Sequence, residues 1–275
     1  MGGTQAGLTS ERRAAFEAHG WLVLRGVVCD RDLIELNRIY DGVMLPTGAA
    51  TGGRGVVQRP HACRTNAALL RHLYDGVAAV ACDLLGARSV RLLQDTLLLK
   101  YPSAAGSIAL HQDYSYTGYL DPPSSLAAGL ALNDATIDSG CLYVVDGSHR
   151  WGLVGGLHVL ADALADDLER RLSPSQRHDV EHRTIPLEVQ AGDVTIHHCL
   201  TLHGSGDNRS DRPRKTIITH LFNGDCRVVP ERVPTAAGQW FATDEHGRLA
   251  EPAFPTLYPP TFETIAAVAT MAEHP

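Results

Sequence analysis

The stretch LHQDYSYTG, residues 110–118, determines which fold and which site this sequence predicts. If the stretch is a strand, His111 and Asp113 project from the same face, with Cα atoms roughly 6.5 Å apart. An imidazole and a carboxylate held in this way can bind one metal ion together. If it is a surface turn, the pair carries no chemistry. The surrounding sequence must decide between the two.

Short apolar runs surround this stretch between residues 88 and 222, and Gly, Pro, Asp and Asn separate them. Several short strands with turn residues between them are typical of an antiparallel sandwich or barrel. The sequence therefore predicts a mainly β core with flanking α-helices. The runs are SVRLLQDTLLLKYP (89–102), LAAGLALNDAT (126–136), GCLYVVDGS (140–148), IPLEVQAGDVTIHH (185–198) and RKTIITHLF (214–222).

The part before this core, residues 10–86, is predicted to be mainly helical. Ser10 is a suitable N-cap for a helix through His19, because its hydroxyl can satisfy free N–H groups of the first turn. Asp30 can cap a second helix. The spacing of apolar residues predicts a third helix over 67–85.

Three further segments lack a strand pattern. Residues 43–66 are rich in Gly, Thr, Pro and Arg and are predicted to form a loop that borders a pocket. Residues 159–179 are charged and are predicted to form a helical excursion between strands, and residues 223–275 form a C-terminal extension. Neither a repeat nor a linker divides the chain, so 1–275 is predicted to be one domain.

Composition restricts the partners and the compartment. The 275 residues are 44% hydrophobic and 20% charged, which is normal for a globular core and argues against disorder. A net charge of −7 gives no electrostatic basis for binding nucleic acid or an anionic membrane. Six scattered cysteines without a Cys-x-x-Cys pair indicate free thiols in a reducing compartment. Because neither a signal peptide nor a membrane-spanning run is found, we expect a cytoplasmic protein.

A facial metal site needs a third ligand, and GDVTIHHCLTLHGSG (192–206) offers His197, His198 and His203. His197 and His203 share strand parity, but six residues of extended strand would place them roughly 20 Å apart. Both could be ligands only if the strand broke. His203 is favoured, because a ligand at a strand end can face the open mouth of a barrel.

Two histidines and one carboxylate leave three adjacent positions open on an octahedral ferrous ion. Oxygenases use this arrangement to hold a cosubstrate and O2 side by side. Arg214 follows His203 by eleven residues, and its guanidinium suits bidentate capture of a distal carboxylate. Ser205 adds a hydroxyl for the same carboxylate.

Taken together, these features resemble the phytanoyl-CoA dioxygenase family of Fe(II)- and 2-oxoglutarate-dependent oxygenases. The resemblance covers nearly all of residues 10–222 and implies a double-stranded β-helix, the cupin-like jelly roll, with N-terminal helices. It rests on LLLKYP (97–102), LHQDYSY (110–116), NDATIDSGCLYVVDGSHRWG (133–152) and HHCLTLHGSGDNRSDRPRK (197–215).

The resemblance also assigns roles to residues. It implies that His111, Asp113 and His203 bind the iron. It further implies that Arg214 and Ser205 bind the far carboxylate of 2-oxoglutarate.

Other residues are assigned to the pocket. Lys100 matches the lysine of the family's Lys-x-Pro element, and Gln94, Thr96 and Lys100 share one face of a strand. We expect this face to line the pocket and to contribute to cosubstrate binding, although Gln94 fits a surface strand position equally well.

Gly129 lies where several relatives carry Trp, so the resemblance implies a wider pocket that admits a larger or multi-ring substrate. Gly129, Ala131 and Asn133 alternate along one run, so they should share a strand face and line the substrate pocket. The alternative is that Gly129 permits close backbone packing or a bulge.

The sequence thus predicts an oxidoreductase that uses Fe(II), 2-oxoglutarate and O2 on a small organic substrate, with a secondary metabolite as the first expectation. Hydroxylation is the commonest outcome; epimerisation, ring closure and desaturation share the same chemistry. The presence of Asp113 disfavours halogenation, because halogenating relatives replace this carboxylate. A zinc hydrolase or isomerase on a cupin-like barrel and a non-catalytic ligand-binding barrel remain the alternatives.

Overall fold

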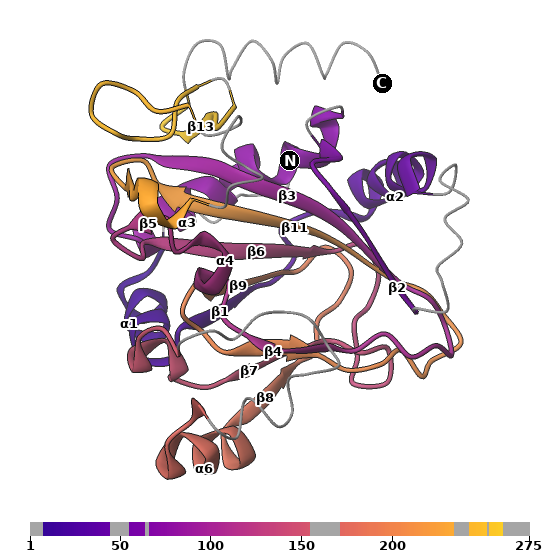
Figure 1. Ribbon diagram of the computed structural model, residues 1–275. Coiled ribbons are helices and arrows are strands. Elements are labelled where there is room, and N and C mark those ends of the chain that lie inside the picture. The colour runs from indigo at the N-terminus through magenta and orange to yellow at the C-terminus, as the bar shows by residue number, and fades with distance from the viewer. Residues whose placement is uncertain are drawn as a thin grey trace.

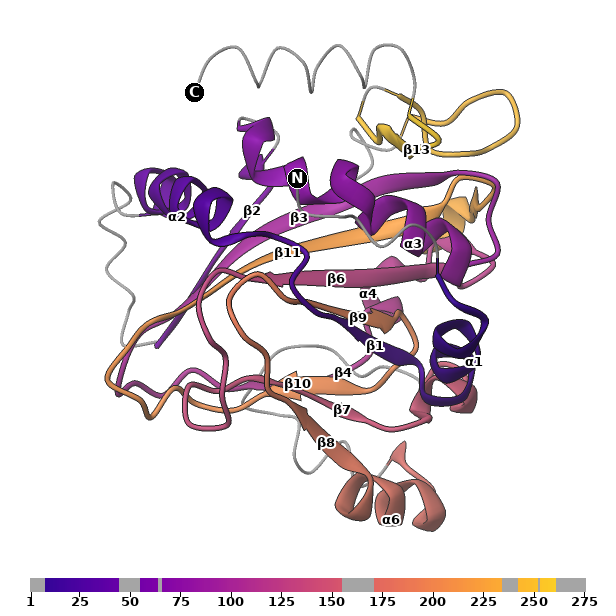
Figure 2. The same cartoon turned by 180° about the vertical axis from the view of Figure 1, so that it is seen from behind.

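In the computed structural model, two antiparallel β-sheets face each other, and helices cover the outer face of the larger one (Figures 1 and 2). This is the predicted jelly roll. The structure describes residues 8–44, 55–63, 66–154, 171–233, 242–251 and 253–260.

The larger sheet has the strand order β1-β9-β6-β11-β3-β13, and β2 also pairs with β3. The smaller sheet has the order β4-β10-β7-β8. The larger sheet comprises β1 (Trp21–Leu24), β2 (Val56–Pro60), β3 (Val90–Lys100), β6 (Ser125–Ala131), β9 (Val194–His198), β11 (Arg214–Asn223) and β13 (Thr256–Tyr258). The smaller sheet comprises β4 (Ile108–His111), β7 (Leu142–Val145), β8 (Thr184–Leu187) and β10 (His203–Ser205), and β5 (Leu120–Asp121) pairs separately with β12 (Arg227–Val228).

Strand alternation divides the larger sheet into a cavity face and a core face. In β11, Arg214, Thr216 and Ile218 line a cavity between the sheets. Ile217 and Leu221 are fully buried on the other face, within the main hydrophobic core. Burial of such side chains on one face fixes the register of the strand, because a shift of one residue would exchange the two faces.

The first helix, α1, spans Ser10–His19 and is capped one residue earlier than predicted. The hydroxyl of Thr9, not Ser10, accepts a hydrogen bond from the Arg12 N–H at 3.3 Å. Gly20 ends the helix in the left-handed region, with φ of 79°. α2 (Asp30–Met44) then packs Leu33 and Leu36 into the core.

The predicted third helix over 67–85 is not continuous. A glycine with φ of 133°, Gly76, interrupts it, so only its last part is α-helical. The apolar stripe is nevertheless buried, with Leu70 and Leu73 in the main core. The segment consists of a 3₁₀ turn (Ala67–Leu70), a π-type turn (Leu73–Val77) and α3 (Ala78–Leu84).

The segments without a strand pattern are only partly described. Half of the predicted 43–66 loop lies outside the described residues, but β2 lies within it and pairs with β3. Of the predicted excursion at 159–179, residues 159–170 lie outside them; α6 (Pro174–His182) begins after the Ser173 cap. Short 3₁₀ turns occupy Ser148–Trp151 and Pro230–Arg232.

Part of the C-terminal extension belongs to the β core. β13 pairs with β3 at the edge of the larger sheet. Leu249 and Phe254 pack with Leu93 and Phe222 in a second hydrophobic cluster. The guanidinium of Arg91 donates hydrogen bonds to the carbonyls of Leu249 and Phe254. Within the described residues, no helix is both long and apolar enough to span a membrane.

Candidate metal centre and adjoining cavity

The His-x-Asp pair lies where a strand passes into a helix, so the stretch is neither one continuous strand nor a surface turn. β4 ends at His111, and Asp113 directly precedes the short helix α4 (Tyr114–Thr117), which lies between the sheets in Figure 1. Gln112, between them, is fully buried, and its amide makes three hydrogen bonds to backbone groups. This anchoring holds the bend, and the side chains of His111 and Asp113 still meet, at 3.7 Å.

His203 completes the group from the neighbouring strand. It begins β10 and lies directly opposite His111 in the register of the smaller sheet. The Oδ1 atom of Asp113 is 3.7 Å from Nε2 of His111 and 3.6 Å from Nε2 of His203. The three residues are buried, and their ligand atoms lie within 4.8 Å of one another. Such a cluster can present two imidazoles and one carboxylate to the same ion.

Hydrogen bonds orient both of these histidines. Nδ1 of His111 is 2.8 Å from the carbonyl oxygen of Ala109, and Nδ1 of His203 is 2.9 Å from that of Thr201. An Nδ1–H that donates to a carbonyl leaves the lone pair on Nε2, which is the usual arrangement of a metal-binding histidine. Burial lowers the pKa of both imidazoles, so the neutral form that can bind a metal is favoured.

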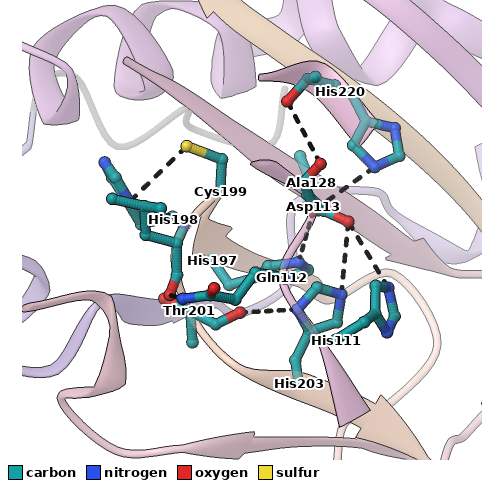
Figure 3. Close-up of polar contacts among 12 residues, drawn as sticks. His111, Gln112, Asp113, Ala128, His197, His198, Cys199, Thr201, His203 and His220 are labelled. Carbon is teal, nitrogen blue, oxygen red and sulfur yellow. Dashed lines mark hydrogen bonds and ion pairs between the residues drawn. The ribbon is translucent and has the colours of Figure 1, made fainter. Parts of the chain in front are cut away.

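Two further histidines contact the same carboxylate (Figure 3). One is His197, which was not favoured as a ligand on the sequence, and the other is His220, which was not predicted to belong to the site. Nε2 of His197, on β9, is 3.1 Å from Oδ2 of Asp113, and Nε2 of His220, on β11, is 3.6 Å from it. Strand parity could have found His220, because it lies an even number of residues after Arg214, on the face that lines the cavity.

The predicted separation of His197 and His203 is wrong. Their ring centroids are 4.0 Å apart, because β9 ends at His198 and the chain turns back before β10 begins. At this turn the hydroxyl of Thr201 donates to the carbonyl of Gly20.

The surrounding histidines keep Asp113 ionised. Burial alone would raise the pKa of this carboxyl, but His203, His220 and the hydrogen bond from His197 together hold it well below its usual value. Reciprocally, burial lowers the pKa of His220, but Asp113 outweighs this effect and raises it.

A second polar group, formed by Arg214 and Ser205, lines the same cavity. Both side chains are buried, and the Nη1 of Arg214 donates to the carbonyl of Gly140. Within the described part of the chain, Nε of Arg214 and Oγ of Ser205 have no hydrogen-bond partner. Burial lowers the pKa of Arg214 to about 10. A carboxylate could accept hydrogen bonds from both groups, so the two unpaired atoms fit the far end of 2-oxoglutarate.

Lys100 lies beside this group rather than in the cavity lining. It is the β3 partner of Arg214 in the sheet register, and its Nζ donates to the carbonyl of Gly206. Burial and the nearby Arg214 lower the pKa of Lys100 to about 7. Among the described residues neither cation forms a salt bridge, so their combined charge favours a bound anion.

The cavity has a volume of about 390 Å³ and extends from the histidine cluster along β3, β6 and β11. Gln94 and Thr96 line it, and the Gln94 amide donates to the Thr96 hydroxyl at 3.3 Å. Asn133 does not line it: its amide binds the carbonyl of Pro213 and the N–H of Lys215 beyond the end of β6.

Gly129 lines the cavity between Ala127 and Ala131 on β6. A Cβ atom at Gly129 would lie 2.9 Å from Oγ1 of Thr195 on the adjacent strand, and 3.6 Å from a methyl of Thr216. The glycine therefore leaves room for the Thr195 hydroxyl at the cavity wall, whereas a wider pocket for a larger substrate stays a prediction.

Comparison with known proteins supports the resemblance to the phytanoyl-CoA dioxygenase family. A model of the phytanoyl-CoA dioxygenase (PhyH) family matches residues 16–216. "Phytanoyl-CoA dioxygenase 1" of Oryza sativa subsp. japonica is 32% identical over 133 residues, which are 48% of this chain and 44% of the rice protein. The match thus spans less than half of that relative.

Two solved structures share the fold. The non-heme α-ketoglutarate-dependent carbocyclase SnoK from nogalamycin biosynthesis is 22% identical, with a TM-score of 0.74 over 90% of this chain and 96% of SnoK. The epimerase SnoN, solved with Fe3+, α-ketoglutarate and nogalamycin RO, is 22% identical, with a TM-score of 0.69 over 89% of this chain and 96% of SnoN.

Proposed function

Because the chain belongs to the phytanoyl-CoA dioxygenase family, and is thus a dioxygenase that depends on Fe(II), 2-oxoglutarate and O2, we propose that it oxidises a C–H bond of an uncharged small molecule. The substrate class that we favour is a secondary metabolite with a bulky, multi-ring skeleton. The zinc hydrolase and the non-catalytic barrel do not agree with this family membership.

One observation carries the substrate proposal: the cavity wall beside the histidine cluster is small and apolar. Ala127, Gly129 and Ala131 form one side of it. Among the described lining residues Arg214 is the only lysine or arginine, and we assign it to the cosubstrate. A fatty acyl-CoA carries several phosphate charges and would need a cluster of basic residues at the cavity. The two nogalamycin enzymes are in line with a multi-ring substrate, by their names and fold alone.

In this proposal His111, Asp113 and His203 hold the iron. Arg214 and Ser205 bind the far carboxylate of 2-oxoglutarate, and Lys100 adds positive charge behind them. When bound, iron with 2-oxoglutarate and O2 supplies the oxidant for the substrate C–H bond, with succinate and CO2 as coproducts. The protein's part is to orient the substrate against the apolar wall and to exclude water from it.

The reaction outcome depends on how the substrate is held. Hydroxylation is our first proposal; epimerisation, ring closure and desaturation are the related outcomes. The polar groups on the cavity wall, Gln94 and Thr96 on β3 and Thr216 on β11, are suited to orient hydroxyl or carbonyl groups of the substrate.

The test combines spectroscopy with a substrate panel. Fe(II) and 2-oxoglutarate are added without O2, and the visible charge-transfer band of the chelated complex is recorded. Succinate formation is then measured in O2 with multi-ring natural products, single-ring analogues and fatty acyl-CoA. Stimulation by multi-ring compounds supports the proposal, whereas stimulation by acyl-CoA alone would overturn the substrate class. Absence of the charge-transfer band would overturn the site.

We also propose a cytoplasmic location. Its support is the set of six free cysteines, five of which are buried. Free thiols are typical of a reducing compartment. Fractionation of the source cells, followed by immunodetection of the chain, tests this assignment.

A further inference from the structure

The two oxygens of Asp113 face different pairs of histidines. Oδ1 is directed toward His111 and His203, at 3.7 and 3.6 Å from their Nε2 atoms. Oδ2 is directed toward His197 and His220, at 3.1 and 3.6 Å. Figure 3 shows the carboxylate between these two pairs.

The two pairs also differ in their second ring nitrogen. Nδ1 of His111 and of His203 is hydrogen-bonded to a backbone carbonyl, so Nε2 is free to bind a metal. Nδ1 of His197 and of His220 is buried without a hydrogen-bond partner among the described residues. Their Nε2 atoms make their only described polar contacts, and these are with Asp113. The Nε2–H group of His197, which donates to the carboxylate, cannot also bind a metal.

The pairs come from different sheets. His111 and His203 lie on β4 and β10 of the smaller sheet, and His197 and His220 lie on β9 and β11 of the larger one. A carboxylate between them is therefore held from one side while it presents an oxygen to the other.

From this geometry we propose that His197 and His220 are positioning residues, which hold Oδ2 of Asp113 so that the carboxylate binds the iron through Oδ1 alone. This inference rests on the proposed iron site. Binding through one oxygen keeps three coordination positions open, and 2-oxoglutarate and O2 together need all three. A carboxylate free to rotate could use both oxygens and occupy one of them.

The distances to Asp113 predict which of the two histidines contributes more to holding the carboxylate. The contact of His197, at 3.1 Å, is within hydrogen-bond range, whereas that of His220, at 3.6 Å, is not. His197 should therefore matter more. Neither residue is a ligand in this proposal, so its removal should weaken metal binding without abolishing it.

The experiment uses Co(II) as a spectroscopic probe on the full-length chain. Co(II) and Fe(II) affinities are measured for the wild type, His197→Leu, His220→Leu and the double variant. Loss of an outer-shell partner typically lowers metal affinity by about 10- to 100-fold. We expect such a loss for His197→Leu, a smaller loss for His220→Leu, and a changed visible Co(II) spectrum in the double variant, because a second carboxylate oxygen would replace a water ligand of the metal.

Rescue separates positioning from simple packing. The amide of glutamine can still donate a hydrogen bond, so His197→Gln should recover most of the affinity and the wild-type Co(II) spectrum, and it also provides a folded variant if leucine is not tolerated. His198→Leu is the matched control, because this neighbouring histidine contacts Phe16 and His149 rather than Asp113.

Three results would overturn the inference. The first is unchanged metal affinity and spectrum in the double variant. The second is a glutamine variant no better than leucine, which indicates packing alone. The third is complete loss of binding in His197→Leu while His111→Leu still binds, which would make His197 a ligand. A wild-type protein that binds neither metal would instead refute the iron site itself.

Discussion

Replacement of Arg214 by leucine should weaken cosubstrate binding strongly without destabilising the free protein. The Arg214 residue is 5% exposed, and its Nε has no hydrogen-bond partner within the described residues. The unbound protein therefore holds a buried cation whose hydrogen-bonding capacity is only partly used. 2-Oxoglutarate would supply the missing acceptor, so Arg214→Leu removes a favourable contact from the complex but an unfavourable charge from the free protein.

The structure allows both effects to be estimated. Loss of a desolvated, hydrogen-bonded charge pair costs about 2–5 kcal/mol, which corresponds to roughly a 30-fold to several-thousand-fold weaker binding of 2-oxoglutarate. Burial lowers the pKa of Arg214 from its ordinary value to about 10, so the charge destabilises the free protein by ~3 kcal/mol. Leaving the Gly140 carbonyl without its donor costs about 1–3 kcal/mol. The free variant should thus be as stable as the wild type or slightly more so.

The assay titrates 2-oxoglutarate into the Fe(II) protein without O2 and follows the charge-transfer band, while thermal unfolding is measured without cosubstrate. Arg214→Lys should have intermediate affinity, because an ammonium keeps the charge but not the bidentate geometry. Lys215→Met is the control: it is the next residue along β11, but it pairs with Asp41 on the helix side. Affinity within twofold of wild type in Arg214→Leu, or equal loss of Fe(II) binding, would refute the reasoning.

Three further predictions follow from the site. His111→Ala should abolish stoichiometric Fe(II) binding and metal-dependent succinate formation; persistence of either in a dialysis and turnover measurement contradicts the ligand assignment. Lys100→Met should stabilise the protein by on the order of 5 kcal/mol below pH 7, because burial makes a charged Lys100 costly there. This gain in stability should shrink as the pH rises from about 7 toward 10.5, since over that range the folded state has already lost the proton that the unfolded state retains. Denaturant unfolding at several pH values measures this, and a gain that does not vary with pH would argue against it. Gly129→Trp, combined with Thr195→Ala to relieve the 2.9 Å contact, should keep uncoupled 2-oxoglutarate turnover but lose oxidation of bulky substrates. With Thr195→Ala alone as the control, normal oxidation of the bulky substrate in the double variant would show that Gly129 does not widen the site.

Local patterns predicted much of the molecule, and their failures have physical causes. Apolar alternation identified β11 correctly, because one face of that strand is buried against helices and the other lines a cavity. The prediction of a continuous third helix was wrong at Gly76. There the backbone adopts a conformation that favours glycine and interrupts an otherwise regular apolar pattern. The cap moved from Ser10 to Thr9, since adjacent hydroxyl residues cannot be ranked without the backbone geometry.

Local sequence patterns also predicted only part of the candidate site. His111, Asp113 and His203 could be chosen because their spacing and strand-end positions carry information within short stretches. The role of His197 could not be predicted in this way. The distance of roughly 20 Å between His197 and His203 assumed an extended chain, whereas the strand ends at His198. Contacts that form only when two sheets pack together leave little trace in a single stretch of sequence.

The packing of the two sheets sets the orientation of the Asp113 carboxylate. Its position between the sheets means that the orientation of the carboxylate depends on the distance between β4 and β10 on one side and β9 and β11 on the other. α4 helps to set this distance, because the N–H of Tyr114 donates to the carbonyl of Cys199, just after β9. A change in the core that moves the larger sheet should therefore act on metal affinity through Oδ2, although it touches no ligand. Under the proposed iron site, the metal centre and the packing of the two sheets in this protein are coupled through Asp113.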